Sequence, residues 1–161
     1  MSSPAPLRAG MEARDTAAVR NAFAPDVVLH SPIIEVPFRG RDEVGDLFDV
    51  ILEVLGPITY LAELPGDPHV LNFRTDVGGV ELEGVDILHL DEQGLIKEIT
   101  VLLRPFPGIA AFLKATGPKL ARLRRGPAQA LLIRAATPPL SGLMKATAAS
   151  TPRLLGLRAK R

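Results

Sequence analysis

Four strand-like segments follow one another in the middle of the chain with very little sequence between them. They cover residues 58–64, 69–77, 80–91 and 95–104, and each linker contains a glycine, as in Gly78-Gly79. Antiparallel strands can be joined by turns this short, whereas parallel strands need a crossover of roughly a dozen residues or more. The sequence therefore predicts consecutive antiparallel hairpins, which limits the chain to folds built on a β-meander.

The clearest helical pattern comes just before these strands. Its apolar side chains recur at the spacing of a single helix face, and they are Val44, Leu47, Phe48, Ile51, Leu52 and Leu55. Asp42 can cap the start of this helix, and Gly56-Pro57 is expected to end it. Two shorter helical patterns, the second with Asp15 as its expected cap, and a short strand at residues 27–31 come earlier.

This order of elements predicts an α+β fold, in which a cone-shaped, strongly curved antiparallel sheet wraps around the helices. A further helix is expected from Ile109 to Gly117-Pro118. We therefore predict a domain over residues 1–118 and a basic, helix-rich C-terminal extension over residues 119–161. Short helical patterns at residues 128–136 and 141–149 lie in this extension.

The charges are divided sharply along the chain. All 18 Asp and Glu residues lie at or before Glu98, whereas residues 99–161 carry 12 Lys and Arg and no acid. We expect the basic extension to lie across its own acidic body or a partner subunit, with contact to an anionic membrane surface as the alternative. Nucleic acid is not expected as a partner, because residues 119–161 contain no aromatic side chain for base stacking.

Composition excludes several kinds of chemistry. Cysteine is absent, which removes thiol nucleophiles, disulfides and iron–sulfur clusters. The three histidines show no metal-ligand spacing, so neither a metal nor another cofactor is expected. The longest uncharged stretch, residues 135–144, is too short to span a bilayer, and the N-terminus lacks the apolar core of a signal peptide. We expect a cytoplasmic protein.

Three segments together carry a resemblance to a known family. They are residues 23–32 (FAPDVVLHSP), 38–44 (FRGRDEV) and 85–96 (VDILHLDEQGLI). In this order and spacing, residues 7–116 resemble the nuclear transport factor 2-like superfamily, in particular its SnoaL-like and ketosteroid-isomerase-like branch. The resemblance implies a cystatin-like roll with an apolar cavity at its open end, and a homodimer. Val85, Ile87 and Leu102 would give such a dimer an apolar outer face.

Asp86 is the candidate catalytic residue. By the two-residue period of a strand it shares a face with Leu82, Gly84, Leu88 and Leu90, which is the more apolar face of its segment. A carboxyl group there has its pKa raised by desolvation, a property typical of functional acids. The alternative is an Asp that only satisfies hydrogen-bond donors inside the fold. The expected ligand-binding residues around it are Ser31, Leu29, Phe48, Phe73, Leu88, Val101 and Leu103.

The family's known active sites match this chain only in part. The resemblance aligns Asp86 with the protonated acid of ketosteroid isomerases, but Ser31 stands where their general-base Asp would be. Leu7 falls near the position of their oxyanion-hole Tyr, so ordinary steroid isomerisation is not expected. The epoxide-hydrolase pattern is met by Arg74-Thr75-Asp76, but its second Asp falls near Val101.

Strand periodicity also predicts where several polar residues point. Arg74 and Asp76 should lie on the outer face of their strand, as a solvated ion pair. His30 and His89 have the opposite parity to Ser31 and Asp86, so they should point away from the pocket. His69 follows a turn.

Three functions stay open from the sequence. The first is binding of a small apolar molecule, whose enzymatic form would be a cofactor-independent isomerase or cyclase that uses Asp86. The second is a non-catalytic, homodimeric interaction module with a basic tail. The third is an epoxide hydrolase-like enzyme.

Overall fold

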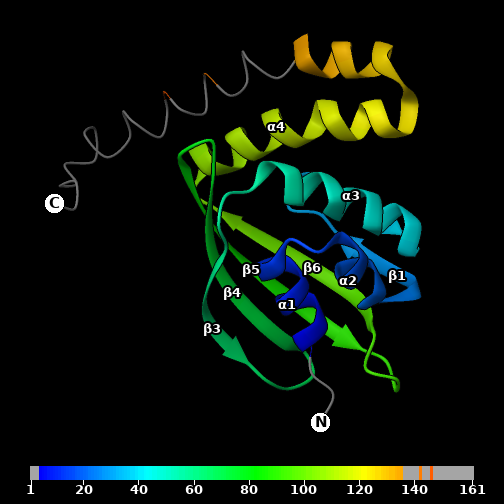
Figure 1. The fold of residues 1–161 in the computed structure, drawn as a ribbon. Helices are drawn as coiled ribbons and strands as arrows, with labels where there is room; N and C mark the ends of the chain where they lie inside the picture. The colour runs from blue at the N-terminus through cyan, green and yellow to red at the C-terminus, as the bar shows by residue number, and fades with distance from the viewer. Residues whose placement is uncertain (1–3, 136–141, 143–145, 147–161) are drawn as a thin grey trace, which may run out of the picture.

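The computed structural model describes residues 4–135, 142 and 146. Ten helices and strands have defined bounds within these residues (Figure 1). They are α1 (Ala5–Ala13), α2 (Thr16–Asn21), β1 (Phe23–His30), β2 (Phe38–Arg39), α3 (Arg41–Val54), β3 (Thr59–Leu64), β4 (His69–Val77), β5 (Val80–Leu90), β6 (Ile96–Arg104) and α4 (Phe106–Arg125). Residues 127–135 are also helical.

All six strands form one sheet in the order β2-β1-β6-β5-β4-β3. The predicted meander is confirmed, because β3, β4, β5 and β6 pair consecutively and antiparallel. The sheet is mixed rather than wholly antiparallel, since β1 runs parallel to β6 with Leu29 opposite Ile99. This parallel pair is possible because α3 and the whole meander connect the two strands, which is far more chain than a crossover needs.

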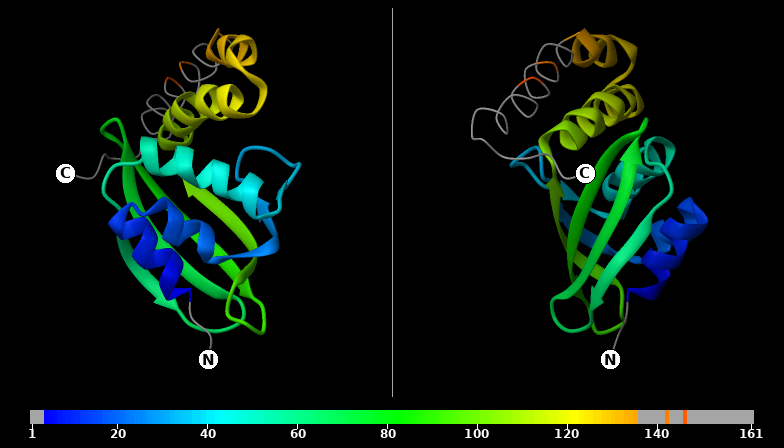
Figure 2. Two further views of the ribbon diagram at one scale, coloured as in Figure 1. Left: turned by 45° about the vertical axis from the view of Figure 1, so that its right-hand side comes forward. Right: turned by 90° about the vertical axis from the view of Figure 1, so that its left-hand side faces the viewer.

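The helices cover one face of the curved sheet, as the views in Figure 2 show. The predicted α+β architecture is therefore confirmed. The main core lies between this face and α1 to α3, where the rings of Phe23 and Phe48 lie 5.0 Å apart. Leu7, Val44 and Leu88 in this core are at most 1% exposed.

Two arginines hold the N-terminal helices against α3. Arg20 of α2 forms ion pairs with Asp46 at 2.7 Å and with Asp49 at 2.6 Å. Arg14 follows α1 and donates a hydrogen bond of 3.1 Å to the backbone oxygen of Leu55, at the end of α3. This bond satisfies a carbonyl that has no partner within the helix.

Of the two predicted helix caps, one is confirmed and the other is wrong. Asp15 accepts a hydrogen bond of 3.0 Å from the backbone N–H of Ala18 and so caps α2 as expected. Asp42, by contrast, lies inside the first turn of α3, and Gly40 is the N-cap. Gly40 has a φ of +81°, a conformation that glycine adopts without strain.

The predicted end of the last helix at Gly117-Pro118 is wrong, because α4 continues to Arg125. Proline inside a helix removes one backbone hydrogen bond, a local cost that tertiary packing can exceed. Here α4 packs against α3 and the sheet. A Cβ at position 117 would lie 3.2 Å from Ile133, so Gly117 lets the helix at residues 127–135 come close to α4.

The boundary predicted at residue 118 therefore falls inside a helix. The domain division itself stays a prediction. The helix expected at residues 128–136 is confirmed over 127–135. Of the pattern at residues 141–149, only positions 142 and 146 belong to the described part of the chain, and both are helical.

The described part of the basic extension lies on the acidic body of the same chain. Lys119 of α4 pairs with Glu53 of α3 at 2.6 Å, and Arg124 of α4 pairs with Glu43 of α3. These contacts agree with the expectation that opposite charges bring the two halves together. Among the residues described, no helix is both long and apolar enough to cross a membrane.

Substitution of Gly84 tests the close packing of the sheet's inner face. A Cβ at this position would lie 2.4 Å from Cζ of Phe73 and 2.8 Å from Cδ2 of Leu103. Gly84→Ala should therefore lower the free energy of unfolding by about 1–3 kcal/mol in urea denaturation. In a Phe73→Leu background the same change should cost less, because the smaller side chain makes room. Equal costs in the two backgrounds would contradict this explanation.

Candidate functional site

A cavity of about 580 Å³ lies between the inner face of the sheet, α3 and α4. Its walls are mostly apolar, with aromatic rings from Phe48 of α3, Phe73 of β4 and Phe112 of α4. The packing of α1 to α3 does not fill this part of the core, although a second apolar cluster around Leu55, Val77 and Leu82 packs against α4. A volume of this size falls in the usual range for sites that hold small organic molecules.

Most of the predicted site residues line this one cavity. They are Ser31, Leu29, Phe48, Phe73, Val101, Leu103 and Asp86. Leu88 does not line it: this side chain is 0% exposed and belongs to the packed core. Leu88 is on the same strand face as Asp86, but it lies two residues further along the strand, where the helices fill the space.

Asp86 is in the middle of β5, opposite Leu71 of β4 and Val101 of β6. Its partly exposed surface faces the cavity. Within the described part of the chain, no side chain or backbone group gives this carboxyl group a hydrogen bond or an opposite charge. Burial therefore raises the pKa of Asp86 to about 7. At neutral pH the group is divided between its neutral and ionised forms.

Tyr60 of β3 brings a further polar group to the cavity, in addition to Asp86 and Ser31. Burial raises its pKa, and the negative charge of Asp86 raises it further, so the hydroxyl stays protonated and can donate a hydrogen bond. Tyr60 is not among the site residues predicted from the sequence. The available signal was that Tyr60 is the chain's only tyrosine and stands two residues after Ile58, which also lines the cavity.

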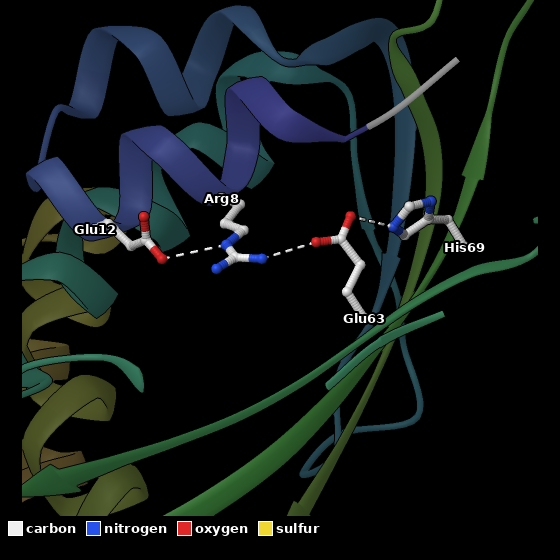
Figure 3. A network of polar contacts seen from close by, with 4 residues as sticks. All are labelled: Arg8, Glu12, Glu63 and His69. Atoms are coloured by element: carbon white, nitrogen blue, oxygen red, sulfur yellow. Dashed lines mark hydrogen bonds and ion pairs between the residues drawn. The ribbon is translucent and has the colours of Figure 1, made fainter. Parts of the chain in front are cut away.

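A network of ionic contacts packs against the ring of Tyr60 through Arg8. The guanidinium of Arg8 is 4.9 Å from the centre of that ring, close enough for a cation–π contact. Figure 3 shows how Arg8 is held between Glu12 at 3.2 Å and Glu63 at 2.8 Å. Glu63 in turn contacts Nε2 of His69 at 2.8 Å.

This network ties α1 to the two outer strands beside the cavity. The hydrogen bond from Arg8, assisted by that from His69, holds the pKa of Glu63 below its usual value against the effect of burial. His69 is the first residue of β4 and only 2% exposed, so it is more buried than its place after a turn suggested. Arg8 thus fixes one face of the Tyr60 ring from outside the cavity.

A sequence profile described as the SnoaL-like domain matches residues 7–99 of this chain. The chain belongs to the SnoaL-like domain family. No curated protein matches the sequence. Solved structures with the same fold include nuclear transport factor 2-like and ketosteroid isomerase-like proteins, as the resemblance implied.

Three of these structures are informative for this SnoaL-like domain. A steroid delta-isomerase from Pseudomonas aeruginosa is 29% identical, covers 74% of this chain and 89% of its own, and has a TM-score of 0.69. An uncharacterised protein with a cystatin-like fold from Silicibacter pomeroyi is 25% identical, with coverages of 84% and 95% and a TM-score of 0.71. The epoxide hydrolase/cyclase-like enzyme SalBIII is 14% identical, with coverages of 60% and 83% and a TM-score of 0.52, and shows the fold alone.

The SnoaL-like scaffold does not bring the residues of the epoxide-hydrolase pattern to the cavity. Neither Arg74 nor Asp76 lines it. Arg74 is exposed and contacts Glu83 at 3.6 Å, while Asp76 accepts a hydrogen bond of 2.8 Å from the N–H of Gly79. The expected outward direction of both side chains is therefore confirmed, although their expected mutual ion pair is replaced by these two contacts.

The other residues singled out in the sequence are the histidines, Ser31 and Leu7, and each has neighbours in the fold that account for its position. Leu7 is buried in the core, and Ser31 lines the cavity, where its hydroxyl accepts a hydrogen bond of 3.2 Å from the N–H of Ile33. His30 contacts Glu98 at 3.1 Å and His89 contacts Asp67 at 2.7 Å, outside the cavity lining. No group of three potential metal ligands occurs among the residues that the structure describes.

The pKa of Asp86 predicts how stability depends on pH. The unfolded chain loses this proton near its ordinary pKa of 3.8, whereas the folded protein keeps it up to about 7. The stability that the proton provides is thus complete below the lower value and is lost as pH rises through the upper one. Asp86→Asn should remove this loss, which amounts to about 2–4 kcal/mol between pH 4 and pH 8.

Urea denaturation across this pH range measures the effect. Asp26→Asn is the matched control, because Asp26 is an exposed residue of β1 that does not line the cavity. Parallel pH profiles for the wild type and Asp86→Asn would show that the carboxyl group has an ordinary pKa.

Leu88→Ala tests the distinction between core and cavity wall. Removing this fully buried side chain leaves a new void, so the free energy of unfolding should fall by about 2–5 kcal/mol. Leu103→Ala, on the same sheet face but beside existing empty space, should cost less. Thermal and urea denaturation of both variants make the comparison, and a larger loss for Leu103→Ala would contradict the placement of Leu88 in the core.

Proposed function

We propose that this protein binds a small, largely apolar molecule in the cavity and forms a hydrogen bond to one of its oxygen atoms through Asp86. The observation that carries the proposal is an unpartnered carboxyl group on a mostly apolar wall. A buried polar group without a partner is costly, so a ligand oxygen that accepts the proton of Asp86 would be favoured. At about 30 Å³ per non-hydrogen atom, the cavity has room for roughly 20 such atoms.

The enzymatic form of this function is proton transfer on a carbonyl compound. A group whose pKa lies near the working pH can serve both as base and as acid. Ionised Asp86 would take a proton from the carbon next to the carbonyl group, and the electron pair of that C–H bond would move to the oxygen as an enolate. Where a C=C bond adjoins that carbon, the enolate is conjugated with it. Asp86, now protonated, would return the proton to the far carbon of the C=C bond as the electron pair on oxygen re-forms the carbonyl group, which shifts the double bond and completes an isomerisation without a cofactor.

Tyr60 supports the proton-transfer part of the proposal. An enolate oxygen needs a hydrogen-bond donor that does not itself ionise. The raised pKa of Tyr60 keeps its hydroxyl protonated, and both Tyr60 and Asp86 line the cavity. The similarity to a steroid delta-isomerase is consistent with carbonyl chemistry at this place in the fold. The expected homodimer stays a prediction; Leu102, which is 53% exposed, lies on the sheet face opposite the cavity.

Binding is tested with a neutral ketone. The fluorescent probe 1-aminoanthracene should bind the cavity, and 2-decanone should displace it. Because only protonated Asp86 can donate to the ketone, its affinity should fall about three- to tenfold from pH 5.5 to pH 8.5. Asp86→Asn should remove this pH dependence, since an amide donates at every pH, whereas Asp26→Asn should retain it.

The outcomes separate clearly. Failure of 2-decanone to displace the probe would refute the cavity as a ketone-binding site. An unchanged pH dependence in Asp86→Asn would refute the assigned role of the carboxyl group.

Proton transfer is tested by hydrogen exchange. In D₂O, wild-type protein should exchange the hydrogens next to the carbonyl group of 2-decanone, as followed by mass spectrometry. Asp86→Asn should lower the rate by about 10²–10⁴-fold and Tyr60→Phe by about 10²-fold. Binding without exchange above the buffer rate would identify a ligand-binding protein rather than an isomerase.

A further inference from the structure

The C-terminal helices build one side of the cavity. The SnoaL-like match ends at residue 99, but α4 and the helix at residues 127–135 supply much of the lining, from Phe112 to Ile133. The two helices lie together over the end of the sheet next to α3 (Figure 2). The part of the ligand farthest from the sheet therefore meets residues outside the family's shared sequence.

This side of the cavity carries positive charge. Arg124, Arg125 and Gln129 are exposed residues that also line the cavity, so they mark its mouth. Besides Asp86, Glu43 is the acid in the described lining. Glu43 is already engaged by the guanidinium of Arg124 and by the backbone N–H of Arg39 at 3.1 Å.

Arg125 is left without a partner at this mouth. None of the residues that the structure describes forms an ion pair with it, although Arg124 and Lys119 on the same helix both have one. Basic residues in the last turn of a helix also interact favourably with the helix dipole. Arg122, in the same last turn, can also interact with the helix dipole, but it does not line the cavity. The dipole alone therefore does not explain why Arg125 lies at the mouth.

We propose that the mouth recognises a carboxylate, and that the ligand is an elongated amphipathic acid whose apolar body fills the cavity. This inference rests on the proposed function and adds the chemical class of the ligand and its orientation. A guanidinium matches a carboxylate with two parallel hydrogen bonds, and the amide of Gln129 can donate beside it.

The two ends of the cavity require this orientation. A carboxylate next to ionised Asp86 would place two like charges in apolar surroundings, which is strongly unfavourable. A neutral oxygen of the ligand therefore lies at Asp86, while its acid group lies at Arg125. The chain between the two groups contacts the apolar walls.

A matched pair of ligands tests the proposal. Dodecanoate and 1-dodecanol have the same hydrocarbon chain, and each is titrated against bound 1-aminoanthracene at pH 8. The full-length wild type should bind dodecanoate about five- to tenfold more tightly than dodecanol. Raising the salt concentration should weaken only the binding of dodecanoate.

Arg125→Gln should abolish the preference for dodecanoate and leave the affinity for dodecanol unchanged. Arg122→Gln is the matched control, because it removes the same charge from the same helix away from the cavity, and it should keep the preference. Both residues are exposed, so both variants should fold normally, which circular dichroism and the melting temperature check.

The results distinguish this proposal from the function on which it rests. Equal binding of the two ligands by the wild type, or an unchanged preference in Arg125→Gln, would overturn the carboxylate site while the apolar cavity stands. If neither ligand displaces the probe, the proposed function itself fails.

Discussion

The inner face of a strongly curved sheet encloses more space than the helices packed on it can fill. Near one end, side chains from α1 to α3 reach the sheet and produce a close-packed core around Phe23 and Phe48. Toward α4 the filling is incomplete, and a cavity of about 580 Å³ is left beside a second apolar cluster. The position of this gap decides which side chains are functional candidates. Asp86 and Leu88 have the same direction on one strand, yet only Asp86 borders empty space.

Periodicity and turn chemistry were sufficient to predict the meander, and most of the residues expected at the cavity do line it. The four strands of the meander differ from their expected bounds by one residue at most, because glycine-containing turns leave little freedom in register. Alternation also gave the direction of Asp86, Arg74 and His89 correctly. It could not separate Leu88 from the cavity residues, since a period of two specifies the face of a strand but not how far along the cone the helices reach.

The other differences between the sequence-based predictions and the structure arise from long-range packing. Pro118 reads as a stop signal locally, but contacts of α4 with α3 and the sheet keep the helix intact to Arg125. The significance of Tyr60 depends on its burial and on Asp86, 26 positions away, which together raise the pKa of its hydroxyl. Arg8, in turn, reaches that ring from a helix at the beginning of the chain. No pattern within a single segment contains these relationships.

The glycine at position 117 has a consequence for how such proteins can diversify. Because it lets the second C-terminal helix approach α4, the wall that completes the cavity is a separate layer laid over the shared scaffold. Changes in that layer can alter the length and polarity of the chamber while the sheet and its acidic group stay the same. Two relatives with identical inner walls can therefore accept different molecules if their terminal segments differ.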